Sequence, residues 1–581
     1  MKNVWTRARE YVAAVLAGAF GVFWFLQSHG DRSLNPRNVD WLMVGDWSTH
    51  LIGWLFFRNE PLRFPLGAVP GLAHPLGTTV GFTDSTPLVA LLLRPFAGVL
   101  PFPFQYVGLW FVLCFFLQGF VGSRLTALFT SHRVAQLLGG VLFAIAPVLL
   151  WRMGHDSLCA HWLVLGLFWV GLRDWPDAPA ARRAVALTFL LVGLSATIHP
   201  YLSAMTLVLG VAVLVRLRWV DGTLSWRGLG LSVGGLVALL LALFWLFGYL
   251  GTGTPSGIEG FGYLSSDLLT FVNPMGWSRL LPTWPTDRVQ HEGFGYLGAG
   301  VLLLLGLGVG SALWGRWMGR SEWAPQWKRG VPLAVCCLLL AVYALSARIT
   351  FQGRLVMDLQ ALYQPAMRFV EPFRSSGRFI WPLHYALLTG ALAIVLGSWR
   401  RQPWVGIGLL ALAVGVQVFD LSEALVRPRF QSQAWNGLRS PDWRRMKDDY
   451  RHLVLFPPQL HDGNGRGCPY PGNGAPFSPM FAYQAASLGM TFNSAYLARV
   501  DPVAAQAYCT ALQQEAERGQ IQPDTVYVVH RSYLEPFLRH PESVVCGVLD
   551  GHAVCVSSAK ESAFRQVLES RPLQAAPLAR P

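Results

Sequence analysis

The sequence predicts a polytopic α-helical membrane protein with a C-terminal α/β domain outside the membrane. Of its 581 residues, 53% are hydrophobic and only 13% are charged, which is unlike a soluble protein of this length. Apolar segments long enough to cross a bilayer recur between residues 11 and 422. From about residue 425 the composition becomes polar, so we expect a transmembrane domain over 1–424 and a soluble domain over 425–581.

The first apolar run, from Tyr11 to Gln27, follows three basic residues and is not followed by a small-residue cleavage site. It is therefore expected to be an uncleaved first span, with the N-terminus in the cytoplasm. Ten further segments of suitable length bring the prediction to eleven spans. They lie at about 104–122, 134–151, 158–173, 184–199, 202–217, 229–250, 296–314, 331–347, 379–397 and 404–422.

The positions of the arginines set the expected orientation. Every short loop on the inner side of this topology is basic, as the positive-inside rule requires. The large loops 28–103, 251–295 and 348–378 and the tail then lie outside, in the periplasm if the membrane is a bacterial inner membrane. Pro87–Leu100 is apolar but short, and Arg94 lies within it, so it is predicted to be re-entrant or to lie in the membrane interface.

The net charge of +14 does not indicate a nucleic-acid partner. Only four of the 46 basic residues are lysines, and most arginines stand singly beside apolar segments. This pattern is typical of topology signals and of contacts with anionic lipids or phosphate groups. We therefore expect membrane lipids and phosphate-bearing ligands as partners, and no nucleic acid.

Four cysteines lie in the polar tail, at positions 468, 509, 546 and 555. An even number of cysteines in one extramembrane region predicts disulfides in an oxidising compartment. Three pairings are possible. We favour Cys546 with Cys555 and Cys468 with Cys509. The tail also shows helical patterns at 442–450 and 502–518, and short strand-like runs at 453–456, 526–529, 544–549 and 553–556.

Asp46 is the first candidate catalytic residue. It follows the first span and, in a helix, would share a face with His50 one turn later. A carboxylate at this place could accept a proton from a substrate hydroxyl. The alternative is that Asp46 caps an interfacial helix. Asp84, in the run Asp-Ser-Thr-Pro, is a second candidate, and the start of a helix is its alternative explanation.

A third cluster lies in the turn after the third predicted span, where His155, Asp156 and His161 fall within seven residues. Such residues could bind a metal or a phosphate, although they are also ordinary turn residues. In the later outer loops, arginines at headgroup depth suit a phosphate, and contact with anionic lipid headgroups is the alternative. The candidate substrate-binding or phosphate-binding residues are Arg58, His155, His161, Asp267, His291, Glu292, Arg374 and Arg378.

Several of these stretches together resemble the GT-C superfamily of polyprenol-phosphate-dependent glycosyltransferases, and an uncharacterised bacterial branch of it most of all. The stretches span the membrane region but not the tail. They are Asp46–His50 with Gly53–Arg58, Asp84–Pro87, Gly154-His155 with His161-Trp162, His291–Gly298, and Phe373–Trp381.

The resemblance implies an inverting transfer from a lipid-phosphate-linked sugar on the outer face of the membrane. An acidic residue in the first outer loop would act as base or metal-linked acid, which implies Asp46, and a second acidic site would fall on Asp156. Some members use a divalent metal, Mg²⁺ or Mn²⁺, for which Asp46, Asp156 and His155 are the candidates here. The first loop departs from the family pattern because it has no paired acidic residues and carries His50 downstream.

The predicted function is therefore transfer of a sugar from a polyprenyl-phosphate-linked donor to a glycan, lipid or protein acceptor. Asp46, His50, Asp84 and Asp156 are the expected catalytic residues. Two alternatives belong to other classes. A transporter or flippase for a lipid-linked glycan would place functional charges at mid-span depth, and a non-enzymatic scaffold for envelope polysaccharide assembly would depend on the tail rather than on the loop carboxylates.

Overall fold

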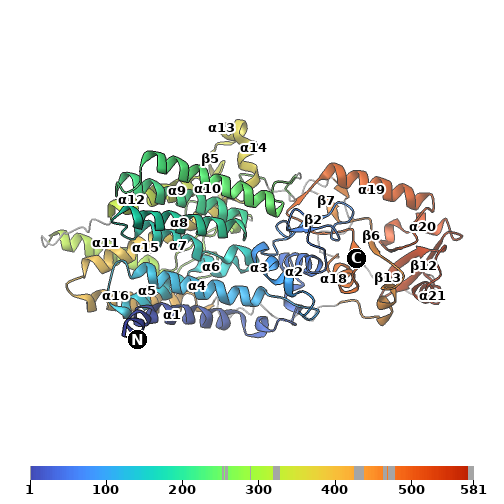
Figure 1. Cartoon of the computed structure of the whole chain (residues 1–581), viewed down its shortest axis with the longest axis horizontal. Helices are drawn as coiled ribbons and strands as arrows, with labels where there is room; N and C mark the ends of the chain where they lie inside the picture. Colours follow the sequence, from blue (N-terminus) through green and yellow to red (C-terminus); the bar gives the residue numbers. More distant parts are fainter. Residues whose placement is uncertain are drawn as a thin grey trace. The chain divides into compact units, whose positions relative to one another are not determined.

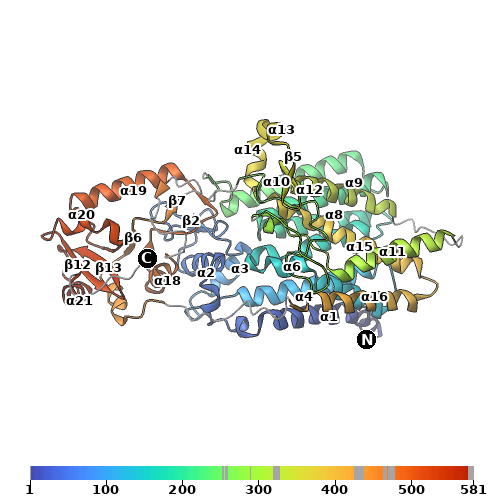
Figure 2. The ribbon, with the colours of Figure 1, turned by 180° about the vertical axis from the view of Figure 1, so that it is seen from behind.

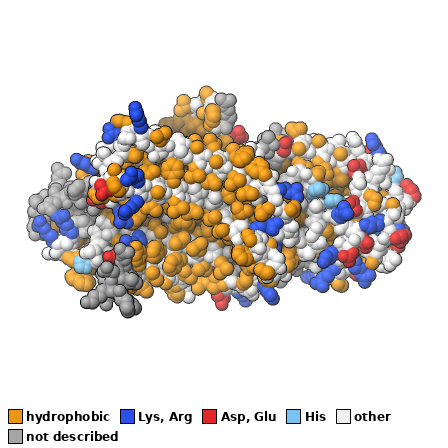
Figure 3. All heavy atoms as spheres, viewed as in Figure 1, with side chains coloured by type: hydrophobic (Ala, Val, Ile, Leu, Met, Phe, Trp, Pro, Cys, Tyr) orange, Lys and Arg blue, Asp and Glu red, His pale blue; other side chains and the backbone are white. Residues whose placement is uncertain are grey.

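Apolar helices make up most of the chain. The computed structural model describes residues 2–251, 254–255, 260–287, 289–317, 327–423, 437–461, 467–468 and 478–573. Within these residues, nine helices are long and apolar enough to cross a membrane. Hydrophobic side chains dominate the face that these helices present in Figure 3. The prediction of a polytopic helical protein is confirmed.

Nine of the eleven predicted spans coincide with these long helices. The other two, near 158–173 and 296–314, correspond to the shorter apolar helices at 156–172 and 299–315. The predicted span at 134–151 is broken in two, because α5 ends at Ala144 and α6 begins at Pro147. A proline has no backbone N–H to donate and disfavours the helical conformation in the residue before it, which here is the extended Ala146.

The described chain forms two compact units. The bundle unit comprises residues 1–35, 107–243 and 259–431, and the sheet unit comprises residues 36–106, 244–258 and 432–581, in each case as far as these residues are described. Much of the predicted first outer loop therefore folds with the tail, although the sequence suggested a domain boundary near residue 425.

The bundle unit is a stack of helices (Figures 1 and 2). Short 3-10 helices lie in several of its connections. Its helices are α1 (Lys2–His29), α4 (Val107–Thr126), α5 (Arg133–Ala144), α6 (Pro147–Trp151), α7 (Trp162–Leu172), α8 (Ala178–Ala196), α9 (Pro200–Trp219), α10 (Trp226–Phe247, up to Leu243), α11 (Ala299–Trp317), α12 (Trp327–Leu345), α13 (Gln360–Tyr363), α14 (Met367–Val370), α15 (Trp381–Ser398) and α16 (Pro403–Asp420). A hairpin of β4 (Arg348–Phe351) and β5 (Arg354–Asp358) completes it.

Small residues allow α1 and α4 to pack closely. A side chain at Gly119 of α4 would collide with the carbonyl oxygen of Ala17, and one at Gly21 of α1 would collide with that of Phe115. Helices in a membrane are associated by such close van der Waals packing, since lipid tails are as apolar as leucine. The glycines in these segments therefore determine which helices become neighbours.

The sheet unit is built around a five-stranded mixed sheet in the order β12-β13-β11-β6-β9. The central strands β6 (His452–Phe456) and β11 (Thr525–Val529) are parallel, and β13 (His552–Ser557) is antiparallel to β11 and to β12 (Val544–Leu549). The four strand-like runs predicted in the tail are these four strands. Charged side chains of both signs are interspersed over this part of the chain in Figure 3.

The sheet unit has further helices and short strands. Its other elements, with the edge strand β9 (Thr491–Phe492), are α2 (Asp46–Phe57), β1 (Ala68–Val69), β2 (Thr78–Thr79), α3 (Pro87–Leu93), β3 (Thr254–Pro255), β7 (Leu460–His461), β8 (Gly467–Cys468), α18 (Ser478–Leu488), β10 (Arg499–Val500), α19 (Pro502–Glu517), α20 (Glu535–Leu538) and α21 (Ala563–Glu569). Of these, α18, α20 and α21 pack on strands of the sheet. The predicted helix at 502–518 is α19, whereas the pattern at 442–450 forms a 3-10 helix at Pro441–Met446.

The first loop is joined to the tail by backbone pairing. The N–H of Phe492 in β9 donates to Gly71 O over 2.7 Å, and the N–H of His74 donates to Phe492 O over 2.9 Å. Asn59, just after α2, donates from Nδ2 to Ala486 O in α18 over 3.2 Å. These contacts place α2, with Asp46 at its first turn, against the C-terminal domain.

Candidate functional site

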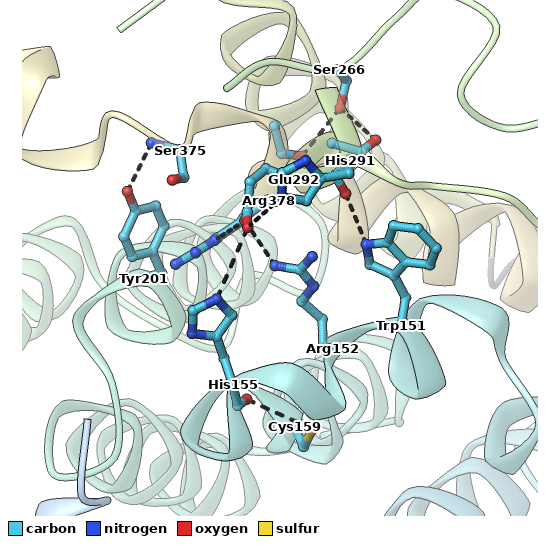
Figure 4. A network of polar contacts seen from close by, with 12 residues as sticks. Trp151, Arg152, His155, Cys159, Tyr201, Ser266, His291, Glu292, Ser375 and Arg378 are labelled. Carbon is cyan, nitrogen blue, oxygen red and sulfur yellow. Dashed lines mark hydrogen bonds and ion pairs between the residues drawn. The ribbon is translucent and has the colours of Figure 1, made fainter. Parts of the chain in front are cut away.

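Glu292 is a buried carboxylate that two arginines of the bundle unit hold. Arg152 donates from Nη1 to Glu292 Oε2 over 2.7 Å, and Arg378 donates from Nε to the same oxygen over 2.6 Å (Figure 4). The three residues are only 3% (Arg152), 8% (Arg378) and 6% (Glu292) exposed. Hydrogen bonds of this length between ionised groups are among the strong ones in proteins. We call these three residues the arginine cluster.

Backbone geometry brings the arginine cluster together. Arg152 begins a 3-10 turn directly after α6, and Arg378 lies in the 3-10 turn Ser376–Ile380 before α15. The segments of Glu292 and Arg378 cross where Gly293 meets Gly377, and a Cβ at Gly377 would lie only 2.6 Å from Gly293 Cα. Ser266 donates from Oγ to the carbonyl oxygens of both glycines, over 3.0 and 3.1 Å. The crossing therefore depends on glycine in both segments.

Two imidazoles face the other oxygen of Glu292. His291 Nε2 lies 3.6 Å from Oε1, and His155 Nε2 lies 4.0 Å from it. These separations exceed a hydrogen bond but are short enough for an electrostatic interaction. The side chain of His291 is 52% exposed and that of His155 is 20% exposed, so the histidines lie toward the accessible side of the arginine cluster.

Aromatic rings flank both guanidinium groups. The Arg378 guanidinium carbon lies 4.7 Å from the centre of the Tyr201 ring, and that of Arg152 lies 5.8 Å from the Trp381 ring. Tyr201 is itself fixed, because its hydroxyl oxygen accepts the N–H of Ser375 over 2.9 Å. Such stacking orients a planar guanidinium without using its donors. Both guanidinium groups are thus oriented by an aromatic ring as well as by Glu292.

The arginine cluster has an excess of positive charge. Two guanidinium groups face one carboxylate, and Arg152 Nε and Ser376 Oγ are buried without a hydrogen-bond partner among the residues that the structure describes. Burial by itself would raise the pKa of Glu292, but the charges of Arg152 and Arg378 outweigh it and hold that pKa well below its usual range. Glu292 is therefore ionised at neutral pH, and the cluster retains the capacity to bind a further anion.

The sheet unit contains a pocket at the N-terminal turn of α2. Its volume is about 200 Å³, and Asp46 lies in its wall. Gly45 precedes the helix with a positive φ of 57° and supplies no side-chain cap, and Asp46 occupies the first helical position. The lining residues come from the first loop and from the C-terminal domain: Gly45, Asp46, Ser48, Thr49, Ile52, Leu72, Gln459, Pro479, Ala482, Ser494, Ala495 and Tyr496.

His50 and Asp84 come together in the sheet unit. His50 Nε2 lies 3.9 Å from Asp84 Oδ2, and His50 is only 2% exposed. The Ser85 hydroxyl donates to His50 O over 2.7 Å, which ties the Asp84 loop to α2. Asp84 has a positive φ of 52° and does not cap the following helix, whose N-cap is Thr86. An imidazole and a carboxylate at this separation are donor types that a divalent cation accepts.

Two of the predicted binding residues, Arg58 and Asp267, make contacts that secure neighbouring loops. Arg58 donates to the carbonyl oxygens of Ala97, Leu100 and Pro101, each over 2.7 Å, and so secures the segment after α3. Asp267 accepts from Thr350 Oγ1 over 2.9 Å and from the backbone N–H groups of residues 269, 352 and 353. Their polar atoms serve these contacts, and a role of Arg58 and Asp267 in substrate binding stays a prediction.

The remaining predicted residues lie in the bundle unit. His161 is fully buried, and its Nδ1 lies 2.7 Å from the Tyr385 hydroxyl. Asp156 is also fully buried, and its carbonyl oxygen accepts the indole N–H of Trp110 over 2.8 Å. Arg374 is partly buried, and its Nη1 makes no hydrogen bond within the described residues. Of the proposed metal ligands, Asp156 and His155 belong to the bundle unit and Asp46 to the sheet unit.

Both predicted disulfides are present in the tail. Cys468 is bonded to Cys509, and Cys546 is bonded to Cys555. The second bond joins β12 to β13 at directly paired positions. The favoured pairing is therefore confirmed.

Sequence reasoning missed some of the residues that complete these sites. For Arg152, the available signal was its position directly after the apolar span at 134–151. Gln459 and Tyr496 gave no local signal, because each reaches its site through contacts between segments that are far apart in the sequence.

Comparison with protein families gives two matches. Residues 18–422 match the family model described as a domain of unknown function, DUF6311, and residues 442–557 match the DUF6311 C-terminal domain. No curated protein matches the chain.

Proposed function

Because this chain belongs to the DUF6311 family, whose description states no activity, we propose its function from its own sites: it is a membrane-embedded glycosyltransferase. It would move a sugar from a polyprenyl-phosphate-linked donor to an acceptor hydroxyl on the outer face of a bacterial inner membrane. The proposal includes the eleven-span topology, with the N-terminus in the cytoplasm and the C-terminal domain in the periplasm.

The observation that carries the proposal is the arginine cluster. Burying two guanidinium groups around one carboxylate is costly, and a ligand that brings a second negative charge would offset part of that cost. The excess positive charge and the unpartnered Arg152 Nε suit the phosphate of a lipid-linked donor. Arginine binds phosphate with two parallel donors, which a planar, stacked guanidinium favours.

Asp46 would act as the general base. It would take the proton of the acceptor hydroxyl as that oxygen attacks the anomeric carbon of the donor sugar. The new carbon–oxygen bond forms while the bond from the anomeric carbon to the phosphate oxygen breaks, and the polyprenyl phosphate leaves with the electron pair. A single displacement of this kind inverts the anomeric centre.

A divalent metal belongs to the proposal as an optional part. In the sheet unit, His50 and Asp84 would hold it. Their atoms His50 Nε2 and Asp84 Oδ2 lie 3.9 Å apart, and an imidazole nitrogen and a carboxylate oxygen are ligand types that Mg²⁺ or Mn²⁺ accepts. When bound, such an ion would supply positive charge that stabilises a leaving phosphate.

The test is a transfer assay on Asp46→Asn in lipid nanodiscs, with a panel of radiolabelled polyprenyl-phosphate hexoses and pentoses as donors. Loss of a general base is expected to lower turnover by about 10²–10⁴-fold at equal protein. Asp40→Asn, at an exposed position of the same loop, serves as the matched control and should retain activity.

Unchanged transfer by Asp46→Asn would refute the role of Asp46. Movement of the labelled lipid between leaflets without a new covalent product would favour a flippase. Neither transfer nor movement, combined with loss of envelope polysaccharide after deletion of the tail, would favour a scaffold.

A further inference from the structure

We infer that the pocket beside Asp46 binds one sugar residue of a saccharide acceptor, and that the C-terminal domain supplies half of this binding site. The inference rests on the proposed function, because it names the class of acceptor whose hydroxyl Asp46 would deprotonate. It follows from the chemistry of the pocket wall, from the way its two halves are fixed, and from its size.

The polar groups of the wall include two strong acceptors, so they select a ligand that donates hydrogen bonds. Asp46 contributes a carboxylate, and Gln459 contributes an amide oxygen, Oε1, that is buried and has no hydrogen-bond partner within the described residues. Thr49 contributes a hydroxyl, which can donate or accept. A buried acceptor without a partner is costly, and a ligand hydroxyl would satisfy it.

The remaining wall suits the apolar face of a sugar ring. Tyr496 is 56% exposed and borders the pocket, where its ring can stack on the C–H face of a pyranose. Ile52, Leu72 and Ala482 supply further apolar surface. A volume of about 200 Å³ admits one sugar ring rather than a long chain, so the rest of an acceptor would extend from the opening.

The half contributed by the C-terminal domain is held rigidly. Asn493 Oδ1 accepts the N–H of Leu455 over 2.8 Å, and Asn493 Nδ2 donates to Leu455 O over 3.1 Å. The N–H of Gln459 donates to Ser494 Oγ over 2.9 Å, and the N–H of Ala495 donates to Gln459 O over 3.2 Å. These bonds fix the segment that carries Tyr496 to the end of strand β6. A site fixed before binding loses less entropy when the ligand arrives.

The other half is contributed by the first loop. Leu72 forms a parallel bridge with Phe492, and α2 packs on α18, which carries Pro479 and Ala482. The carboxylate and the amide oxygen thus come from segments more than 400 positions apart.

The experiment is saturation-transfer NMR with the full-length protein in nanodiscs. The probes are the methyl glycosides of glucose, mannose, galactose and N-acetylglucosamine, at millimolar concentration. At least one probe should receive saturation from the wild type. Tyr496→Ala should weaken its binding by about tenfold, the effect expected when an aromatic contact of this kind is lost. Gln459→Leu should weaken it similarly, and the exposed Gln506→Leu in α19 should leave it unchanged.

Absence of binding for all four glycosides, or binding that survives both Tyr496→Ala and Gln459→Leu, would overturn the inference. This experiment measures glycoside binding, so its result does not depend on whether the protein transfers sugar. Binding that Tyr496→Ala abolishes, together with full transfer by Asp46→Asn, would sustain the saccharide site and refute the proposed base. Comparable circular dichroism of each variant guards against misfolding.

Discussion

The side chain of Glu292 compensates two buried guanidinium charges, and its replacement measures how much the bundle depends on it. Glu292→Gln keeps the shape but leaves Arg152 and Arg378 without a counter-charge. Removing one member of a buried ion cluster typically costs about 3–5 kcal/mol of unfolding free energy. We expect a clearly lower midpoint of thermal unfolding in detergent micelles.

Glu535→Gln is the matched control for this measurement. Glu535 pairs with Arg539 on the surface, where both side chains are mostly exposed. Such a pair contributes about 0–1 kcal/mol, so its loss should barely shift the midpoint. Equal shifts for the two variants would contradict the buried charge balance described for Glu292.

The ionisation of Glu292 predicts how the stability of the folded protein changes with pH. The pKa of Glu292 is lowered on folding, so the unfolded state binds more protons as the solution becomes acidic. The stabilisation by Glu292 is therefore complete above its ordinary pKa of about 4.5 and is lost as the pH falls through the lower pKa of the folded state. The difference in unfolding midpoint between wild type and Glu292→Gln should shrink below about pH 4.5. A difference that grows in acid would contradict this assignment.

For single residues, the sequence identified Glu292 and Arg378 as candidate binding residues but could not show that they contact each other. Their contact depends on the crossing of Gly293 with Gly377, and Arg152 completes it from a segment about 140 positions earlier. Residue type predicted the chemistry, and only the fold determined which charges meet.

Among the elements, α2 is positioned by a glycine. A Cβ at Gly53 would collide with the hydroxyl oxygens of Thr83 and Ser85. Gly53→Ala should therefore displace α2 from the Asp84 loop and cost about 1–3 kcal/mol, as overpacking does. Hydrogen exchange of the amides at 83–90, measured by mass spectrometry, should increase.

Gly306→Ala provides the comparison within a helix. A Cβ at Gly306 of α11 would meet no atom within 4 Å, and alanine favours a helix over glycine. This variant should be neutral or slightly stabilising. Unchanged exchange in Gly53→Ala would show that the Asp84 loop is not held by its contact with α2.

The predicted span at 134–151 shows that apolar length alone does not reveal a break within a helix. Hydropathy predicted one span at 134–151, but Pro147 divides it, and the turn that follows carries Arg152 and His155. Apolar length does not reveal such a break, whereas the proline itself was a signal for it. The break matters because it brings polar residues to the end of the bundle.

At the scale of the whole molecule, the two disulfides stabilise the tail to different extents. Cys468–Cys509 spans 41 residues and Cys546–Cys555 spans 9. In the chain-entropy model a longer loop loses more unfolded-state entropy, so their removal should cost about 4 and about 2.5 kcal/mol. Paired serine variants, compared by pulse proteolysis in urea with a C-terminal tag, should rank in this order.

Cys336→Ser is the control, because Cys336 is a free cysteine of α12. It should leave the urea midpoint of the tail unchanged. A larger loss from the 9-residue loop would show that contacts around the cysteines, rather than loop length, dominate the effect.

The sequence by itself determined the helical membrane architecture and four strands of the tail, and it favoured one disulfide pairing out of three. These properties follow from apolar length, from alternation and from cysteine positions, which are local or nearly local features of the chain. Only the tertiary structure decided that the first loop folds with the C-terminal domain, that Arg58 and Asp267 serve backbone groups, and that Gln459 and Tyr496 reach the pocket of Asp46. Each of these depends on contacts between distant segments, and no short sequence window contains the partners of such a contact.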